Sequence, residues 1–306
     1  MTQNVFDYMT ILVGRKRAAG RDSTADLYRV VRNRLSFFLK SKKLHFNGIT
    51  VELIDGFAAT LRTEGLAVNT VNSYLSSFRA MYHAALREEM FETARDPFAR
   101  LCLRREETAK RALPTETISE LMEMKVKVEE EPAMQETLDL FLFSYLACGI
   151  PFIDLAYLKE KNIVGDEIVY HRHKTGTLVR VGITEAMRLL LNRYAREGSR
   201  YLFPILREGK DGHEAYKAAL HTYNTMLKEI GERLAFPSKL TSYVARHTWA
   251  TEALRQNIPV AVISQALGHT SEKTTRIYLA QLDQSVLNKA NEAVTKEVGD
   301  SIMKRA

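Results

Sequence analysis

Two hairpin signals in an otherwise helical sequence constrain the fold most. Three short β-forming runs, NIV at 162–164, EIVYHRH at 167–173 and LVRVGI at 178–183, are separated by Gly165-Asp166 and by KTGT at 174–177. Such short turns join antiparallel neighbours, because a parallel pair needs a much longer crossover. Elsewhere apolar residues recur with a helical period. The sequence therefore predicts a mainly α protein with a small antiparallel β-sheet.

The pattern predicts two domains. Residues 1–105 contain four amphipathic helices, at 5–20, 23–41, 50–65 and 67–90, with Ser23 or Thr24 capping the second and Thr50 the third. Residues 106–114 are charged and poor in apolar side chains, which predicts a linker. Residues 115–306 form the second domain, with the hairpins, further helices and a tail helix after Tyr278.

The positive charge is concentrated at the N-terminal end. The net charge is +7, and residues 1–110 hold 18 Lys and Arg against 12 Asp and Glu. Such a surplus attracts polyanions, so nucleic acid is the expected partner. On the helix at 67–90 the aromatic face predicts core packing. The opposite face fits either DNA contact or an ordinary solvated surface, and consists of Asn69, Thr70, Asn72, Ser73, Ser76 and Arg79.

Several other function classes find no support in the sequence. It has no run of eighteen apolar residues and no signal peptide, which favours a cytoplasmic protein. Cys102 and Cys148 stand outside any metal-binding spacing, so neither a zinc site nor a disulfide framework is expected. A P-loop is also absent. We expect no metal and no cofactor.

A constellation of polar residues near the C-terminus points to chemistry. Thr241 or Ser242 is expected to cap a helix, which places Arg246 in a first turn that favours an anion. A helix from Pro259 to Gly268 then leaves His269 on a short loop, and Tyr278 follows nine residues later. A tyrosine on an amphipathic helix usually packs in a core, and a role as a nucleophile is the alternative for Tyr278.

These residues resemble the tyrosine recombinase family, also called phage-type integrases. The family pattern is H-x-x-R, then LGH about two dozen residues on, then a nucleophilic tyrosine nine residues after that histidine. The matching positions are Tyr243, Arg246, LGH at 267–269 and Tyr278. The family also has a catalytic lysine on a β-hairpin, and the segment HRHKTG resembles that hairpin, which gives Lys174 in this chain. The resemblance covers nearly the whole chain. It implies a helical core-binding domain that clamps DNA and an α+β catalytic domain.

The resemblance implies a site-specific recombinase that integrates, excises or inverts DNA through a covalent 3′-phosphotyrosine at Tyr278. Arg246, His269 and Tyr243 would hold the phosphate, and Lys174 would protonate the departing 5′-oxygen. It also implies a homotetramer on two DNA sites, accessory DNA-bending proteins in some systems, and a tail that docks on a neighbouring protomer. We expect no room for an arm-site domain ahead of the first helix.

Two departures from the family pattern leave alternatives open. In ACGIPFIDLAYL, Pro151 occupies the position of the family's first arginine, and Tyr243 replaces a histidine. Arg172 or Arg180 on the hairpin could supply the missing charge. Otherwise the chain could be a catalytically silent DNA-binding protein, or relax supercoils as a type IB topoisomerase does. Lys174 could also be a solubilising hairpin lysine, while structural roles are favoured for His247 and Trp249.

Overall fold

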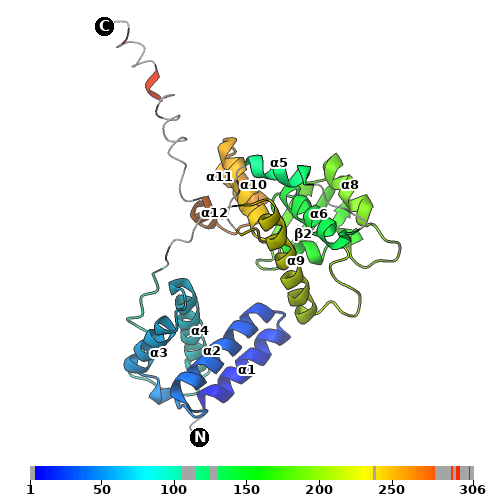
Figure 1. Ribbon diagram of the computed structural model, residues 1–306. Coiled ribbons are helices and arrows are strands. Elements are labelled where there is room, and N and C mark those ends of the chain that lie inside the picture. The colour runs from blue at the N-terminus through cyan, green and yellow to red at the C-terminus, as the bar shows by residue number, and fades with distance from the viewer. Residues whose placement is uncertain are drawn as a thin grey trace. The chain divides into compact units, whose positions relative to one another are not determined.

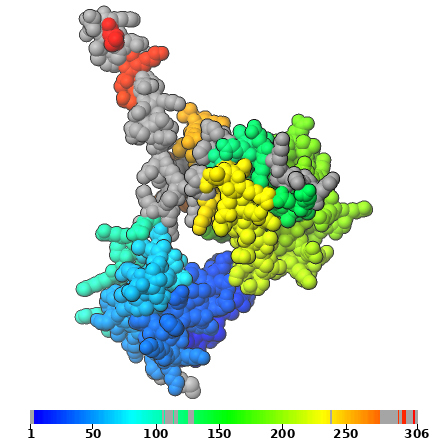
Figure 2. Space-filling view, viewed as in Figure 1, coloured from blue at the N-terminus to red at the C-terminus, as the bar shows by residue number. Residues whose placement is uncertain are grey.

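The computed structural model describes residues 4–104, 106, 113, 115–124, 130–236, 239–279, 291, 294–296 and 303. The chain divides into two compact units, Met1–Ala109 and Lys110–Ala306. In the space-filling view the first unit is coloured from blue to cyan and the second from green through yellow and orange to red (Figure 2). The predicted linker lies outside the described residues except for Glu106 and Leu113, as does most of the predicted tail helix.

The described part of the first unit is built from helices (Figure 1). They are α1 (Val5–Ala18), α2 (Asp22–Leu39), α3 (Val51–Thr63) and α4 (Val68–Arg87), with a 3-10 turn η1 (Phe46–Gly48) between α2 and α3. The Thr50 side chain caps α3 by accepting from the N–H of Leu53. The expected Ser23 or Thr24 cap is wrong, because α2 begins one residue earlier, at Asp22, and Arg21 occupies the cap position without a side-chain hydrogen bond.

The aromatic face of α4 forms the core of the first unit, as its spacing predicts. Phe78 lies at the centre, with edge-on ring contacts to Phe57 of α3 and to Phe98. The other buried residues of α4 are Val71, Leu75, Ser77, Met81, Tyr82 and Ala85. Burial of rings of this size supplies most of the stabilisation that holds such a small helical unit together.

Two polar residues of α4 hold the segment that leaves the first unit. Asn72 donates its side-chain amide to the carbonyl oxygen of Arg104 at 2.7 Å. Asn69 donates to the carbonyl of Glu106 at 2.8 Å and accepts from its backbone N–H at 3.1 Å. Both asparagines therefore have a structural task. In the second unit, the buried Leu113 donates its backbone N–H to the Thr248 hydroxyl at 3.0 Å.

The second unit surrounds a small antiparallel sheet. Its strands are β1 (Ile163–Val164), β2 (Glu167–His171) and β3 (Leu178–Gly182), in the order β1-β2-β3, and Val169 lies opposite Arg180. Alternate residues, Ile168, Tyr170, Val179 and Val181, face the core. The helices are α5 (Thr115–Glu123), α6 (Pro132–Leu146), α7 (Phe152–Ala156), α8 (Glu185–Tyr194), α9 (His213–Arg233), α10 (Val244–Arg255), α11 (Val260–Ala266) and α12 (Glu272–Leu279), with a 3-10 turn η2 (Glu160–Asn162).

The apolar α6 organises the core of this unit and packs against α8, α9 and α10. Trp249 packs on a smaller apolar cluster formed by α10 and α11, in agreement with the core position expected for it. Among the described residues, no helix is long and apolar enough to cross a membrane.

Candidate active site

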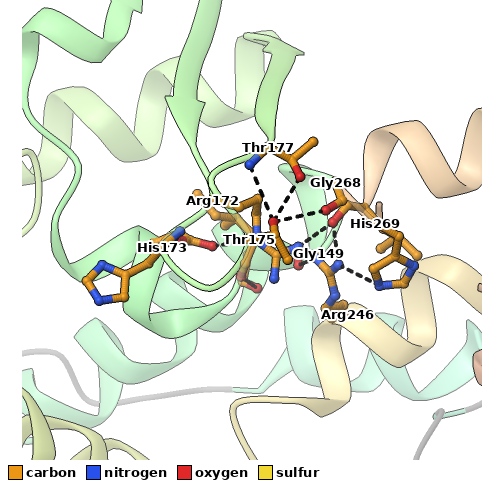
Figure 3. Close-up of polar contacts among 12 residues, drawn as sticks. Gly149, Arg172, His173, Thr175, Thr177, Arg246, Gly268 and His269 are labelled. Carbon is orange, nitrogen blue, oxygen red and sulfur yellow. Dashed lines mark hydrogen bonds and ion pairs between the residues drawn. The ribbon is translucent and has the colours of Figure 1, made fainter. Parts of the chain in front are cut away.

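Two buried arginines meet at one backbone carbonyl in the second unit (Figure 3). Arg246, the third residue of α10, is 3% exposed, and Arg172, directly after β2, is 6% exposed. The Nη2 group of Arg246 and the Nη1 group of Arg172 both donate to the carbonyl oxygen of Leu267. Arg246 also donates from Nη1 to the carbonyl of Gly149 at 2.9 Å. A guanidinium presents its donors in a fixed plane, which suits phosphate oxygens equally well.

Glycines allow the backbone to approach these arginines. Gly149 and Gly268 have φ angles of +70° and +63°, which favour glycine. A Cβ at Gly149 would lie 2.6 Å from the Cα of Arg246. At Gly268 a Cβ would lie 2.6 Å from Cγ2 of Val179 and 2.8 Å from Cγ of Arg172. Packing therefore requires a glycine at position 268, directly before His269.

His269 contacts Arg246 and the helix that carries Tyr278. Its Nε2 lies 3.2 Å from Nη2 of Arg246, and its Nδ1 lies 2.8 Å from the hydroxyl of Thr275. Because a guanidinium can only donate, we assign Nε2 as the acceptor and place the proton on Nδ1. Desolvation, and then the charges of Arg246, Arg172 and Lys174, lower the pKa of His269 to about 4. The imidazole is therefore neutral at physiological pH.

Lys174 and Tyr243 are both exposed to solvent. Lys174 is exposed in the turn between β2 and β3, where its charge acts on His269, and among the described residues it has no ion-pair partner. The neighbouring Thr175 hydroxyl lies 3.5 Å from the carbonyl oxygen of Gly268, which brings the turn toward the His269 loop. Tyr243, at the start of α10, is 45% exposed, with its ring centre 6.1 Å from that of His247. The expected Thr241 or Ser242 cap of α10 is wrong, because Tyr243 holds that position.

Tyr278 belongs to α12, three residues after Thr275. The hydrogen bond between Thr275 and His269 therefore fixes the start of the helix that carries the expected nucleophile. The side chain of Tyr278 lies outside the described part of the structure, so its role stays a prediction. No feature of the sequence indicated the part played by Thr275.

Asp154 anchors the hairpin loop that carries Arg172 and Lys174. Its Oδ1 accepts the backbone N–H of His173 at 2.7 Å. Its Oδ2 forms an ion pair with Nε of Arg172 at 2.8 Å, although the two groups are not aligned for a hydrogen bond. Burial raises the pKa of the Asp154 carboxyl, against the effects of the His173 hydrogen bond and the Arg172 charge. Nothing in the sequence indicated the partners of Asp154.

The structure distinguishes the two hairpin arginines. Arg180 points away from the site, because β3 alternates and its neighbours Val179 and Val181 are buried. Its guanidinium pairs with Glu167 on the adjacent strand, with Nε 3.0 Å from Oε2. Arg172 lies beside Arg246. Of the two alternatives that the sequence left open, the structure therefore places only Arg172 in the site.

The fold and this cluster agree with comparisons to known proteins. The phage integrase family model matches residues 112–285, and the phage integrase SAM-like domain matches residues 4–101. The chain belongs to the phage integrase family, the tyrosine recombinases, and is an enzyme that transfers DNA strands in site-specific recombination. The predicted family and fold class, mainly α with a small antiparallel β-sheet, are confirmed.

Individual relatives extend over most of the chain. The chain is 27% identical to tyrosine recombinase XerD of Proteus mirabilis over 269 residues. The aligned residues cover 84% of this chain and 82% of that protein. The solved structure of a lambda integrase(75–356) dimer bound to a COC′ core site aligns with a TM-score of 0.67 and 13% identity, over 92% of this chain and 98% of that one. A lambda integrase tetramer bound to a Holliday junction aligns with a TM-score of 0.62 and 14% identity, over 89% and 75%. At such identities the structural likeness supports the fold alone.

Proposed function

We propose that Tyr278 attacks the scissile phosphodiester of duplex DNA and forms a covalent 3′-phosphotyrosine. Arg246, His269 and Tyr243 hold the phosphate, and Lys174 protonates the departing 5′-oxygen. The observation that supports this proposal most is the contact between Arg246 and His269, on the loop that leads into the helix of Tyr278. The exposed Lys174 lies close enough to affect the pKa of His269.

The proposed step balances without a cofactor. A bond forms between the Tyr278 oxygen and phosphorus, the bond from phosphorus to the 5′-oxygen breaks, and the phenolic proton passes to water. Lys174 supplies the proton that the 5′-oxygen takes up. Fixed donors stabilise the charge that develops on the nonbridging oxygens. Attack by a 5′-hydroxyl on the phosphotyrosine then reverses the chemistry and rejoins a strand.

His269 requires one adjustment to the role expected from the sequence. With Nε2 accepting from Arg246, it does not donate from that atom in the structure described here. An arriving phosphate would bring negative charge, which raises the pKa of a neighbouring imidazole and favours the doubly protonated form. Hydrogen-bond donation from Nε2 to the phosphate is then coupled to proton uptake.

The proposal includes DNA as the partner and a homotetramer on two DNA sites. The solved lambda integrase structures, a dimer on a core site and a tetramer on a Holliday junction, support it by likeness of fold. The first unit would act as the core-binding part of a DNA clamp, with accessory DNA-bending proteins and a cytoplasmic location as further expectations. The catalytically silent alternative and the topoisomerase alternative are not favoured over recombination.

A nicked suicide duplex that carries the flanking DNA repeats tests the nucleophile. Tyr278→Phe removes only the phenolic oxygen, so we expect unchanged DNA binding and no denaturant-resistant protein–DNA band. Tyr145→Phe is the matched control, because that hydroxyl makes no hydrogen bond among the described residues and its loss should leave the band intact. Persistent adduct in Tyr278→Phe would refute the assignment.

A further inference from the structure

Pro151 leaves the site short of one cation that its family pattern contains. It is buried at the cap position of α7, with a φ angle of −65°. Proline carries no charge and no backbone N–H, so it can donate nothing to a phosphate. Its carbonyl oxygen is occupied as well, accepting the N–H of Leu155 at 2.9 Å. The missing charge must come from another residue if the developing phosphate charge is to meet two guanidinium groups.

We propose that Arg172 is a catalytic residue that supplies the second guanidinium to the scissile phosphate, in place of the arginine that Pro151 replaces. This inference rests on the proposed function. Arg172 and Arg246 donate to the same Leu267 oxygen, so their guanidinium groups converge from two different elements. Like charges held this close repel each other, and an anion bound between them relieves that repulsion.

The donors of Arg172 are partly unused in the structure. Its Nη1 donates to Leu267 and its Nε faces Asp154, while its Nη2 has no hydrogen-bond partner among the described residues. Nη2 is not one of the fully buried unpaired atoms of the described residues, so this donor stays accessible to solvent and to a ligand. A nonbridging phosphate oxygen at that group would accept a charge-assisted hydrogen bond of the kind that Arg forms best.

Asp154 acts as the positioning residue for this cation. The ion pair fixes the guanidinium, and the hydrogen bond to the His173 N–H fixes the backbone next to it. Preorganised donors of this kind lose little entropy when charge develops in the transition state. During the step described above, Arg172 moves no proton. It donates to a nonbridging oxygen while the bond to the 5′-oxygen breaks and Lys174 protonates that oxygen.

The test compares two substrates in single-turnover adduct formation. One is the ordinary suicide duplex, and the other carries an uncharged methylphosphonate at the scissile position, which has less need of a second cation. We expect Arg172→Ala to slow cleavage of the phosphodiester by about 100- to 1,000-fold, with DNA affinity unchanged. On the methylphosphonate the deficit should fall below about 10-fold, since only charge stabilisation is lost. Arg180→Ala is the matched control and should behave as wild type.

Thermal unfolding shows whether Arg172→Ala folds. If it does not, Arg172→Lys decides the question, because this variant keeps a positive charge beside Asp154. It should show a smaller deficit on the phosphodiester that also shrinks on the methylphosphonate, because lysine keeps a positive charge but lacks the planar donors of arginine. If whichever of the two variants folds cleaves the phosphodiester at the normal rate, or shows an equal deficit on both substrates, the proposal is overturned. A wild type that forms no adduct at all, or a Tyr278→Phe variant that still forms one, refutes the proposed function instead.

Discussion

At the scale of single residues, Lys174 illustrates how the site divides its cations. The two arginines are buried beside the carbonyl of Leu267, whereas Lys174 is exposed on the turn that Asp154 anchors. An arginine stays protonated at any physiological pH and can only stabilise charge, while a lysine can give up a proton. The structure thus supports separate tasks for the two kinds of side chain.

Replacement of Lys174 should remove proton donation and leave phosphate binding. We expect Lys174→Ala to slow cleavage by about 100- to 10,000-fold, the usual contribution of a general acid. A duplex with sulfur at the 5′-bridging position should restore near-normal cleavage, because a thiolate leaves without protonation. Lys161→Ala, an exposed lysine of η2, serves as the control in the single-turnover assay. An equal loss on the sulfur substrate would exclude Lys174 as the acid.

At the scale of elements, the loops matter more than the helices they connect. The turn after β2 carries Arg172, and the α11–α12 loop carries His269. Gly268 lets these two loops pack together, since its hydrogen atom faces Val179 and Arg172 where a Cβ would collide. The site is therefore assembled by close backbone contact between segments that lie far apart in the sequence.

Gly268→Ala should disrupt both loops. The change combines a backbone conformation that costs about 1–2 kcal/mol for alanine with a steric collision. Gly165→Ala is the matched control, because Gly165 has a similar φ of +59° but open space around its Cβ position. Thermal unfolding and single-turnover cleavage should show a larger loss for Gly268→Ala. Equal losses in the two variants would contradict the packing argument.

Local patterns in the sequence predicted most elements, and long-range contacts limited the rest. The hairpins were predictable because Gly165-Asp166 and Gly176 mark turns between alternating strands. The caps of α2 and α10 were wrong, since one helix starts a residue early and the other begins at Tyr243. The position of Arg172 could not be predicted, because it depends on carbonyls and a carboxylate contributed by other elements.

At the scale of the whole molecule, the distribution of charge should govern binding. Residues 1–110 hold 18 Lys and Arg against 12 Asp and Glu, so phosphate neutralisation should release counterions. We expect the logarithm of DNA affinity to fall linearly with the logarithm of salt concentration, with a slope of about −0.9 for each phosphate neutralised. Fluorescence anisotropy with a labelled duplex measures this slope. Affinity that does not change with salt would contradict binding along the phosphate backbone.

The chemical identity of the covalent bond to Tyr278 can be measured directly. Adduct formed on a suicide duplex is digested with a protease and a nuclease, and the peptide that retains a nucleotide is sequenced by mass spectrometry. We expect one modified peptide, with the nucleotide joined through its 3′-phosphate to the oxygen of Tyr278. A nucleotide on a different residue, or one joined through a 5′-phosphate, would contradict this assignment.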